Sequence, residues 1–282
     1  MAEFPSPPEG KTIAAVIGDP VLHSLSPTIY NAAFEHDQVD WIYTAINVPT
    51  EEVGHLVEQM RTLQVGGLSV TMPHKEIAAN LVDETTHHAQ KLGVVNCISK
   101  KGNSLVGHNT DGEGFLRALQ AETNEEVDGK SCLIIGAGGA ARAVSLALGE
   151  SGAKEVIIAS RDNSKSETAA SLAGTNGRTG SLSESQQVDI IINATPIGME
   201  GTQNEDRVPL TLAGMHKNQI VIDLIYHPLE TAFLSSAREI GTRTMNGIGM
   251  LIHQAALQYT LWTQKEAPLD VMYDTVMRKI SR

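Results

Sequence analysis

The chain has 282 residues, of which 41% are hydrophobic and 19% charged, and its formal net charge is -12. This length accommodates two domains with a sizeable core, and the composition is that of a soluble globular protein. The negative charge, with no local basic cluster, argues against a nucleic-acid partner. Because no apolar run approaches the roughly 18–20 residues of a membrane span, we expect no membrane partner and a cytoplasmic location.

The N-terminal segment "MAEFPSPPEG" has neither a basic start nor an apolar stretch, so we expect a frayed, proline-rich tail rather than a secretory signal. Cys97 and Cys132 lie in apolar segments and are predicted to be core residues of a protein in a reducing compartment. His87 and His88 are adjacent, so on a helix they point about 100° apart. No HExxH or CxxC motif accompanies them, and no metal site is expected.

Strand and helix signals alternate along the chain, which predicts an α/β architecture with largely parallel sheets. Strands are expected at 12–18, 41–47 and 67–71, and segments 94–99 and 104–109 can pair as a hairpin. Ser26 can cap a helix that has Pro27 in its first position. A second helix is expected over 50–64, with Glu51 and Glu52 in its first turn and one apolar stripe, Val53, Leu56, Val57, Met60 and Leu63.

A second unit begins near residue 112. Segment 131–152 is predicted to be a strand, a glycine turn and a helix, and further strands are expected at 155–160, 188–195 and 219–225. Segment 173–187 is rich in Gly, Ser and Thr, which is typical of a loop. Beyond residue 247 we expect two helices, 248–264 and 268–281, which have to pack on one of the two units.

The segment "GAGGAA", residues 136–141, follows a buried strand and opens a helix. Gly136 permits a tight turn, and Gly138 lets the backbone approach a pyrophosphate at the helix N-terminus. The third glycine of the usual fingerprint is Ala141, which is also small. Glycine turns occur as well where a helix and a strand simply pack closely, but the strand–turn–helix context favours dinucleotide binding.

The end of the second strand of this unit distinguishes between cofactors. An acidic residue there would bind the ribose 2′-hydroxyl of NAD, whereas this chain first offers Ser160 and Arg161, with Lys165 close behind. Arginine can pair with the 2′-phosphate of NADP. Asp162 leaves NAD open, because a small loop rearrangement would bring its carboxylate, instead of Arg161, to the ribose. The pattern therefore favours NADP, with NAD as the alternative.

Two charged residues follow predicted strands of the first unit. Lys75 lies in "GGLSVTMPHKE" (66–76), and Asp111 lies in "GHNTDG" (107–112). Open α/β sheets place their clefts at the carboxyl ends of strands, and a lysine–aspartate pair can hold a hydroxyl and move its proton. Singly, Lys75 would be a surface charge and Asp111 a helix cap; beside a nicotinamide site the catalytic interpretation is favoured.

Two further polar features indicate a ligand. Ser24 and Ser26 place two hydroxyls before a helix, where they can bind a carboxylate. Gln254 interrupts the apolar stripe Met250, Leu257, Leu261. Because buried amides need partners, either a polar ligand or another polar core group is expected beside it.

Taken together, these motifs resemble one family, shikimate dehydrogenase. The resemblance covers nearly the whole chain in order: "GDPVLHSLSPTIYNAAF", "GGLSVTMPHKE", "LGVVN", "GHNTDGEGF", "GAGGAARA", "NATPIGM" (193–199), "DLIYHPLETAFL" (223–234) and "NGIGMLIHQAA" (246–256). It departs from the family's frequent residues at four positions, Tyr30, Val94, Cys97 and Ser160. None of these four removes a group assigned to chemistry.

The resemblance implies two α/β domains: a substrate-binding domain, residues 1–111 completed by the C-terminal helices 247–282, and a Rossmann-like NADP-binding domain, residues 112–246. It also implies the reversible reduction of 3-dehydroshikimate to shikimate with NADPH, in the biosynthesis of chorismate and the aromatic amino acids. Neither a monomer nor a homodimer is excluded.

The resemblance assigns roles by position. Ser24 and Ser26, helped by Tyr226, would bind the substrate carboxylate, and Lys75 with Asp111 would handle the proton of the reacting hydroxyl. The residues that would contact ring hydroxyls are Thr71, Lys75, Asn96, Asp111 and Gln254. The residues that would bind the cofactor are Gly136, Ala137, Gly138, Gly139, Ala140, Ser160, Arg161, Lys165, Asn193, Ala194, Thr195, Met199 and Gly247.

Three alternatives remain open. A quinate or quinate/shikimate dehydrogenase using NAD or NADP would share the scaffold, although the intact serine pair favours shikimate. A catalytically silent protein that binds nucleotide or shikimate would not need Lys75 or Asp111. An unrelated Rossmann enzyme would give the serine pair and Gln254 no role.

Overall fold

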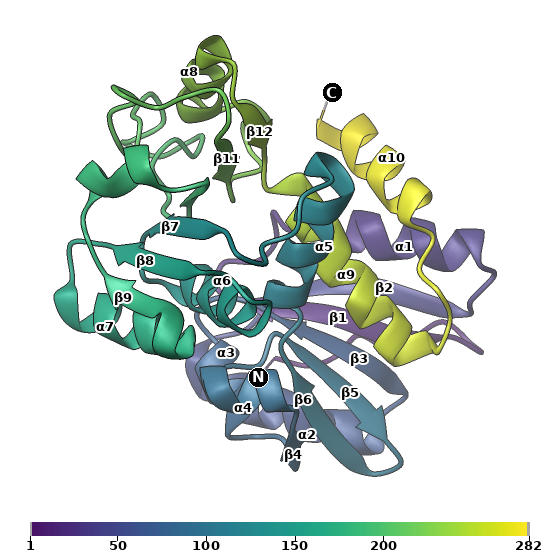
Figure 1. The fold of residues 1–282 in the computed structure, drawn as a ribbon. Coiled ribbons are helices and arrows are strands. Elements are labelled where there is room, and N and C mark those ends of the chain that lie inside the picture. The colour runs from purple at the N-terminus through teal and green to yellow at the C-terminus, as the bar shows by residue number, and fades with distance from the viewer. Residues whose placement is uncertain (1, 281–282) are drawn as a thin grey trace. The chain divides into compact units, whose positions relative to one another are not determined.

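The computed structural model describes residues 2–280, and the chain divides by its contacts into two units (Figure 1). Unit 1 comprises Met1–Thr110 and Gln254–Arg282, and unit 2 comprises Asp111–His253. Each unit is built on a six-stranded sheet. The predicted α/β class is confirmed.

Unit 1 opens with alternating strands and helices and ends in the C-terminal helices. Its elements are β1 (Thr12–Gly18), α1 (Ser26–His36), β2 (Trp41–Asn47), the 3-10 helix η1 (Thr50–Glu52), α2 (Val53–Thr62), β3 (Val65–Val70), α3 (Lys75–Ala79), β4 (Glu84–Thr85), α4 (His87–Leu92), β5 (Cys97–Lys101), β6 (Ser104–His108), the end of α9 (Ile248–Thr263) and α10 (Leu269–Ile280). The strand order is β2-β1-β3-β5-β6-β4. β1 pairs in parallel with β2 and β3, whereas β5 is antiparallel to β3 and β6, so the predicted hairpin is confirmed.

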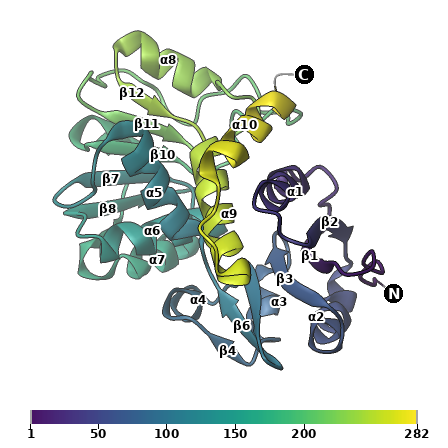
Figure 2. The same cartoon turned by 90° about the vertical axis from the view of Figure 1, so that its right-hand side faces the viewer.

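The two faces of this sheet are covered differently. Figure 2 shows α1 and α2 on opposite sides of β1 and β3. The α2 side is aliphatic, and its buried residues include Ile13, Leu56 and Met60. The other side is aromatic, with Tyr30 and Phe34 of α1 packed against rings from β2 and α9. Both faces of the strands are therefore buried, which explains their continuous apolar runs.

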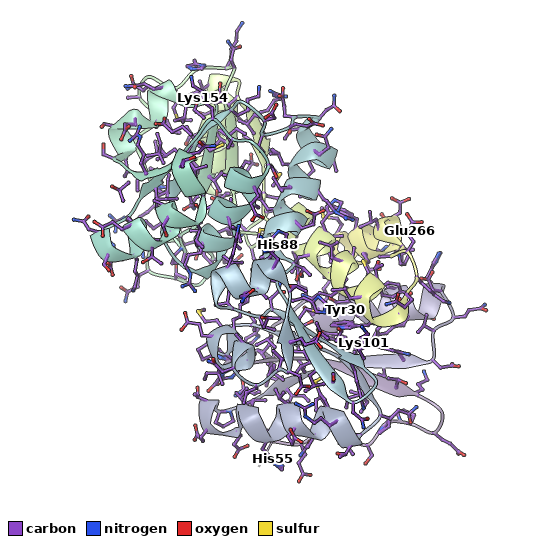
Figure 3. The ribbon with its side chains drawn as sticks, turned by 60° about the horizontal axis from the view of Figure 1, so that its bottom comes forward. Tyr30, His55, His88, Lys101, Lys154 and Glu266 are labelled. Atoms are coloured by element: carbon purple, nitrogen blue, oxygen red, sulfur yellow. The ribbon has the colours of Figure 1, made fainter. Side chains whose placement is uncertain are left out.

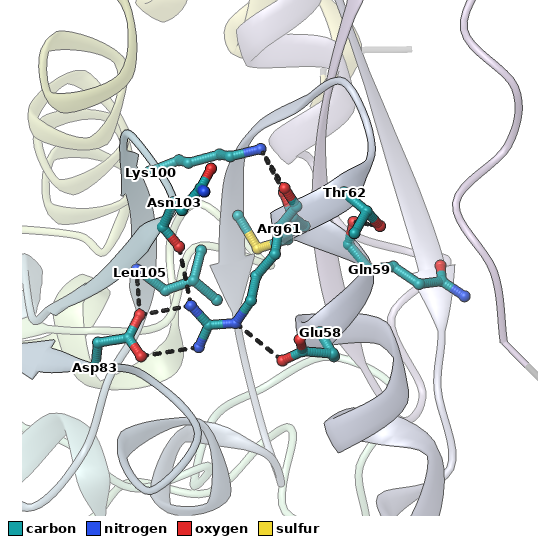
Figure 4. Close-up of polar contacts among 9 residues, drawn as sticks. Glu58, Gln59, Arg61, Thr62, Asp83, Lys100, Asn103 and Leu105 are labelled. Carbon is teal, nitrogen blue, oxygen red and sulfur yellow. Dashed lines mark hydrogen bonds and ion pairs between the residues drawn. The ribbon is translucent and has the colours of Figure 1, made fainter.

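A charged cluster ties the end of α2 to the neighbouring strands (Figure 4). Nζ of Lys100 donates to the carbonyls of Met60, at 2.8 Å, and Arg61, at 3.1 Å. Arg61 pairs with Asp83 at 2.6 Å and with Glu58 at 2.9 Å, and it lowers the pKa of the Asp83 carboxyl. A cation beside the last carbonyls of a helix is favourable because these groups have no partners within the helix.

Unit 2 is an entirely parallel, doubly wound sheet. Its elements are α5 (Asp111–Thr123), β7 (Ser131–Ile135), α6 (Gly139–Glu150), β8 (Glu155–Ala159), α7 (Asn163–Leu172), η2 (Gly174–Asn176), β9 (Gly177–Thr179), η3 (Leu182–Gln187), β10 (Ile190–Asn193), β11 (Ile220–Asp223), α8 (Ala232–Ile240), β12 (Arg243–Met245) and the start of α9. The strand order is β12-β11-β10-β7-β8-β9. The order reverses between β7 and β10, and open sheets of this type bind ligands at the carboxyl ends of the strands beside such a point.

Several sequence-based expectations were wrong. The N-terminal segment is not frayed over residues 2–8, because Phe4 is buried against unit 1 and its N–H donates to Gln59 at 3.3 Å. Segment 173–187 is not a simple loop: it carries β9 and the helix η3, whose start is held by a capping box between Ser181 and Glu184. Leu63 lies beyond the end of α2 and is exposed.

Cys97 and Cys132 are buried and unpaired, as predicted. Burial raises the pKa of both thiols, that of Cys132 to about 12. Over residues 2–280, no helix combines the length and apolar character that crossing a bilayer requires. Within the same residues, His, Cys, Asp and Glu side chains form no group of three or more that could hold a metal ion.

Candidate functional site

The segment that carries Lys75 is fixed at the exit of β3. The N–H of Thr71 donates to Ile17 at 2.9 Å, and the N–H of His74 donates back to Thr71 at 2.9 Å. The buried ring of His74 places Nε2 2.7 Å from the carbonyl of Val48, so this nitrogen carries the hydrogen. Lys75 then opens α3 as a partly exposed residue. Lys75 therefore lies just beyond the carboxyl end of β3, where the sequence predicted it.

The serine pair is arranged differently from the prediction. Ser26 does not cap α1, because the capping position is Leu25, which makes no side-chain cap bond. Instead, Oγ of Ser24 accepts the N–H of Ser26 at 3.2 Å, which is the interaction that a capping serine normally makes. Ser26 is buried, as the first residue of α1.

Asn96 and Gln254 are joined by a residue that sequence reasoning missed. The side chain of Asn96 bonds Thr110 twice, with Oδ1 accepting the N–H at 2.9 Å and Nδ2 donating to Oγ1 at 3.0 Å. Nε2 of Gln258 donates to Oε1 of Gln254 at 2.8 Å. Gln258 is thus the polar core group that Gln254 was expected to need. The available signal was a second amide four residues later, on the same face of an apolar helix.

The remaining predicted substrate residues belong to unit 2. Asp111 is buried in the first turn of α5, where a carboxylate is favourable. Tyr226 follows β11, and burial raises the pKa of its phenol. Lys75 and Asp111 fall in different units, so their pairing stays a prediction.

The glycine turn of unit 2 fits a pyrophosphate. Gly136 has φ of 108°, and a Cβ there would lie 3.0 Å from the carbonyl oxygen of Ala194. At Gly138 and Gly139, by contrast, an added Cβ would meet no atom within 4 Å, so this part of the turn is open. The N-terminus of the 12-residue helix α6 follows at once, with unpaired N–H groups typical of anion sites.

At the end of β8, Arg161 is exposed and can bind a ligand, whereas Asp162 is already hydrogen-bonded within the protein. Oδ1 of Asp162 caps α7 by accepting the N–H of Lys165 at 3.1 Å, and Oδ2 lies 3.5 Å from Nζ of the same residue. That N–H lowers the pKa of the Asp162 carboxyl. Arg161 is exposed, and among residues 2–280 it has no ion-pair partner. The arrangement suits a 2′-phosphate better than a ribose hydroxyl, because the carboxylate is already used.

The loop after β10 is held by a buried carboxylate. Asp223 accepts from Nδ2 of Asn193 at 3.0 Å, from the N–H of Ile225 at 3.1 Å and from Oγ1 of Thr231 at 2.8 Å. Oδ1 of Asn193 accepts the hydroxyl of Thr195 at 2.7 Å. Burial raises the pKa of Asp223 to about 6, against these three hydrogen bonds, which lower it. The Asn193 side chain therefore shapes the loop.

The other predicted cofactor residues also lie in unit 2. Ala137 and Ala140 flank the open glycines, Ala194 follows β10, and Met199 is 39% exposed. A Cβ at Gly247 would lie 2.1 Å from the carbonyl oxygen of Leu224, so the chain passes β11 too closely for any side chain.

Comparison with known families matches most of the chain. The shikimate dehydrogenase substrate binding domain matches residues 16–98, shikimate / quinate 5-dehydrogenase matches 118–226, and the shikimate 5'-dehydrogenase C-terminal domain matches 247–277.

Similar proteins extend over the full length. A shikimate dehydrogenase (NADP(+)) of Methanopyrus kandleri is 41% identical over 95% of this chain and 96% of its own. One of Bacillus cereus is 40% identical over 96% of this chain and 99% of its own. Among solved structures, a shikimate dehydrogenase in complex with NADP+ is 35% identical, with a TM-score of 0.92 and 98% of each chain covered. The Thermus thermophilus enzyme in complex with NADP(H) and shikimate is 32% identical, with a TM-score of 0.87 and coverage of 95% and 99%.

Proposed function

Because the chain belongs to the shikimate dehydrogenase family, we propose that it catalyses the reversible, NADP-dependent reduction of 3-dehydroshikimate to shikimate. The observation that carries the proposal is the full-length similarity to relatives named NADP-dependent shikimate dehydrogenases. Residues 1–111 and 247–282 form the substrate-binding domain, and residues 112–246 form the NADP-binding domain. We also propose that the protein is located in the cytoplasm.

Polar side chains bind the substrate. Ser24, Ser26 and Tyr226 bind its carboxylate, and Thr71, Asn96 and Gln254 bind its ring hydroxyls. This division suits the side chains, because hydroxyl and amide groups donate to carboxylate oxygens and exchange hydrogen bonds with hydroxyls.

Lys75 and Asp111 handle the proton. In the direction of oxidation, Nζ of Lys75 accepts the proton of the reacting hydroxyl oxygen, and in the reverse direction it returns that proton. Asp111 assists this transfer, because a carboxylate favours the charged ammonium form that Lys75 reaches when it takes the proton. When bound, NADP(H) accepts or supplies the hydride.

NADP is the cofactor that the residues of unit 2 fit. The open turn at Gly138 and Gly139 receives the pyrophosphate, and Arg161 with Lys165 receives the 2′-phosphate. The capping role of Asp162 supports NADP over NAD, because its carboxylate already accepts an N–H of α7.

Quinate is the less favoured substrate, and the intact serine pair supports shikimate. A silent binding protein is disfavoured, because such a protein would not need Lys75 and Asp111.

The first test gives the purified protein shikimate and NADP and follows the absorbance of reduced nicotinamide. We expect turnover that requires both compounds. A folded protein that binds both compounds without turnover would refute the enzyme and support a binding role, whereas turnover of quinate alone would move the protein to the quinate-specific branch.

A further inference from the structure

Gln258 lies at the centre of a buried polar network in unit 1. Its side chain is only 1% exposed. Oε1 accepts the hydroxyl of Tyr30 at 3.0 Å and that of Ser69 at 2.5 Å. Nε2 donates to Oε1 of Gln254 at 2.8 Å and to Oγ1 of Thr110 at 3.2 Å. Nε2 also lies 3.5 Å from the carbonyl oxygen of Asn96, so the acceptor and the donor side of the amide are both occupied and its orientation is fixed.

Two branches of this network end at residues proposed to bind substrate. The first branch reaches Gln254 directly. The second passes through Thr110 to Asn96, whose Nδ2 donates to the same Oγ1 at 3.0 Å.

The third branch passes through Ser69 to Tyr43, whose Oη donates to Oγ of Ser69 at 2.6 Å. One side chain is thus linked to two of the groups that would bind shikimate, Gln254 and Asn96.

The aromatic side of the sheet holds the network rigid. The ring of Tyr30, labelled in Figure 3, stacks on that of Tyr43 with centroids 4.3 Å apart and lies 5.1 Å from that of Trp262. Burial raises the pKa of both phenols, so their hydroxyls remain protonated donors at neutral pH. The hydroxyl donors therefore hold Oε1 of Gln258 on their side and direct Nε2 toward Gln254 and Thr110.

The orientation of the Gln258 amide determines the orientation of the Gln254 amide. Because Oε1 of Gln254 accepts from Gln258, its amide nitrogen lies on the other side of the group and can donate to a substrate oxygen. If the amide of Gln258 were reversed, the amide of Gln254 would reverse as well. A hydroxyl oxygen of the substrate would then face the carbonyl oxygen of Gln254 instead of its N–H.

We propose that Gln258 is a positioning residue that sets the affinity for the substrate through Gln254, without touching the substrate itself. This inference rests on the proposed function. It predicts an effect on the binding of shikimate that is separate from the binding of NADP.

The decisive variant is Gln258→Glu, which keeps two acceptor oxygens for Tyr30 and Ser69 but loses the N–H that orients Gln254. We expect the KM for shikimate to rise about tenfold, the effect of one lost or reversed hydrogen bond. The kcat is expected to fall less than about threefold, and the Kd for NADP to stay within about twofold. Gln90→Glu is the matched control, because it adds the same charge at an exposed position of unit 1.

A double-mutant cycle distinguishes positioning from general support of the core. If Gln258 acts through Gln254, the KM effect of Gln258→Glu should shrink to below about twofold in a Gln254→Ala background. Additive effects in the cycle would overturn the inference. Should Gln258→Glu not fold, Gln258→Met, which removes the same N–H without adding charge, is measured in the same cycle.

The wild type separates the two proposals. If the wild type does not turn over shikimate, the proposed function fails. If the wild type is active and the Gln258 variants keep its KM for shikimate, only the positioning role fails.

Discussion

Asp223 provides a quantitative test of the energetics of unit 2. It is 0% exposed and accepts three hydrogen bonds, from Asn193, Ile225 and Thr231. Burial nevertheless raises its pKa from the ordinary 3.8 to about 6, because desolvation disfavours the charged form more than these donors favour it. The folded protein therefore holds a proton that the unfolded chain releases.

The sign and size of the effect follow from linkage. Below the unfolded pKa of 3.8 the carboxyl is neutral in both states, so its favourable contribution to the free energy of unfolding is fully present. That contribution is lost as the pH rises through the folded value, and the total loss is about 3 kcal/mol at 1.36 kcal/mol for each pKa unit. Between about pH 4.5 and about pH 7.5 the loss is about 2 kcal/mol.

The assay compares wild type with Asp223→Asn by urea unfolding. Circular dichroism is the suitable signal, because both tryptophans, Trp41 and Trp262, belong to unit 1. The amide does not titrate, so the stability of Asp223→Asn relative to wild type should increase by about 2 kcal/mol from about pH 4.5 to about pH 7.5.

The matched control is Asp189→Asn. Burial acts to raise the pKa of Asp189, but hydrogen bonds from Ser131 lower it overall. Its contribution is present above the unfolded pKa of 3.8 and is lost only as the pH falls below that value, so the stability of the control relative to wild type should stay nearly constant between about pH 4.5 and about pH 7.5. A pH-independent difference between Asp223→Asn and wild type would refute the buried-carboxylate reasoning.

Three further substitutions test the proposed site. Lys75→Ala should lower kcat by about 10²–10⁴-fold and leave the Kd for NADP within about twofold, and wild-type-like turnover would contradict the proton role. Arg161→Ala should raise the KM for NADP about tenfold while that for NAD changes little, whereas equal losses would show that this residue does not bind the 2′-phosphate. Gly136→Ala should weaken NADP binding measured by titration at least about tenfold, because a Cβ there would lie 3.0 Å from the carbonyl oxygen of Ala194. Gly102→Ala, at φ of 63° in open space, controls for backbone strain alone and should retain NADP affinity.

The strands that are buried on both faces are among those that the sequence predicted. β1, β7, β10 and β11 are rich in Val, Ile, Leu and Ala, and short apolar runs of this kind are typical of strands covered on both sides. β9 (Gly177–Thr179) and β12 (Arg243–Met245) escaped prediction. Each has three residues, includes an exposed arginine and lies at an edge of the sheet, so tertiary pairing rather than composition determines it.

The candidate site was predictable where chemistry follows a strand end and not where it depends on distant contacts. Lys75 and the glycine turn follow strands, so they could be predicted from their neighbouring residues in the sequence. The spacing of Gln258 from Gln254 was a local signal, but its role could not be predicted, because its partner Tyr30 is 228 residues away in the chain. Ser26 does not cap the helix as expected, because the helix begins one residue earlier than the position of Pro27 suggested, and its N–H is instead accepted by Oγ of Ser24.

The most direct measurement is kcat/KM for shikimate and for quinate, each with NADP and with NAD, on the purified wild-type protein. The account predicts that shikimate with NADP exceeds each other pair by at least about tenfold. An equal or higher value for quinate with NAD would contradict the assignment of both substrate and cofactor, although the fold and the lysine–aspartate chemistry would stand.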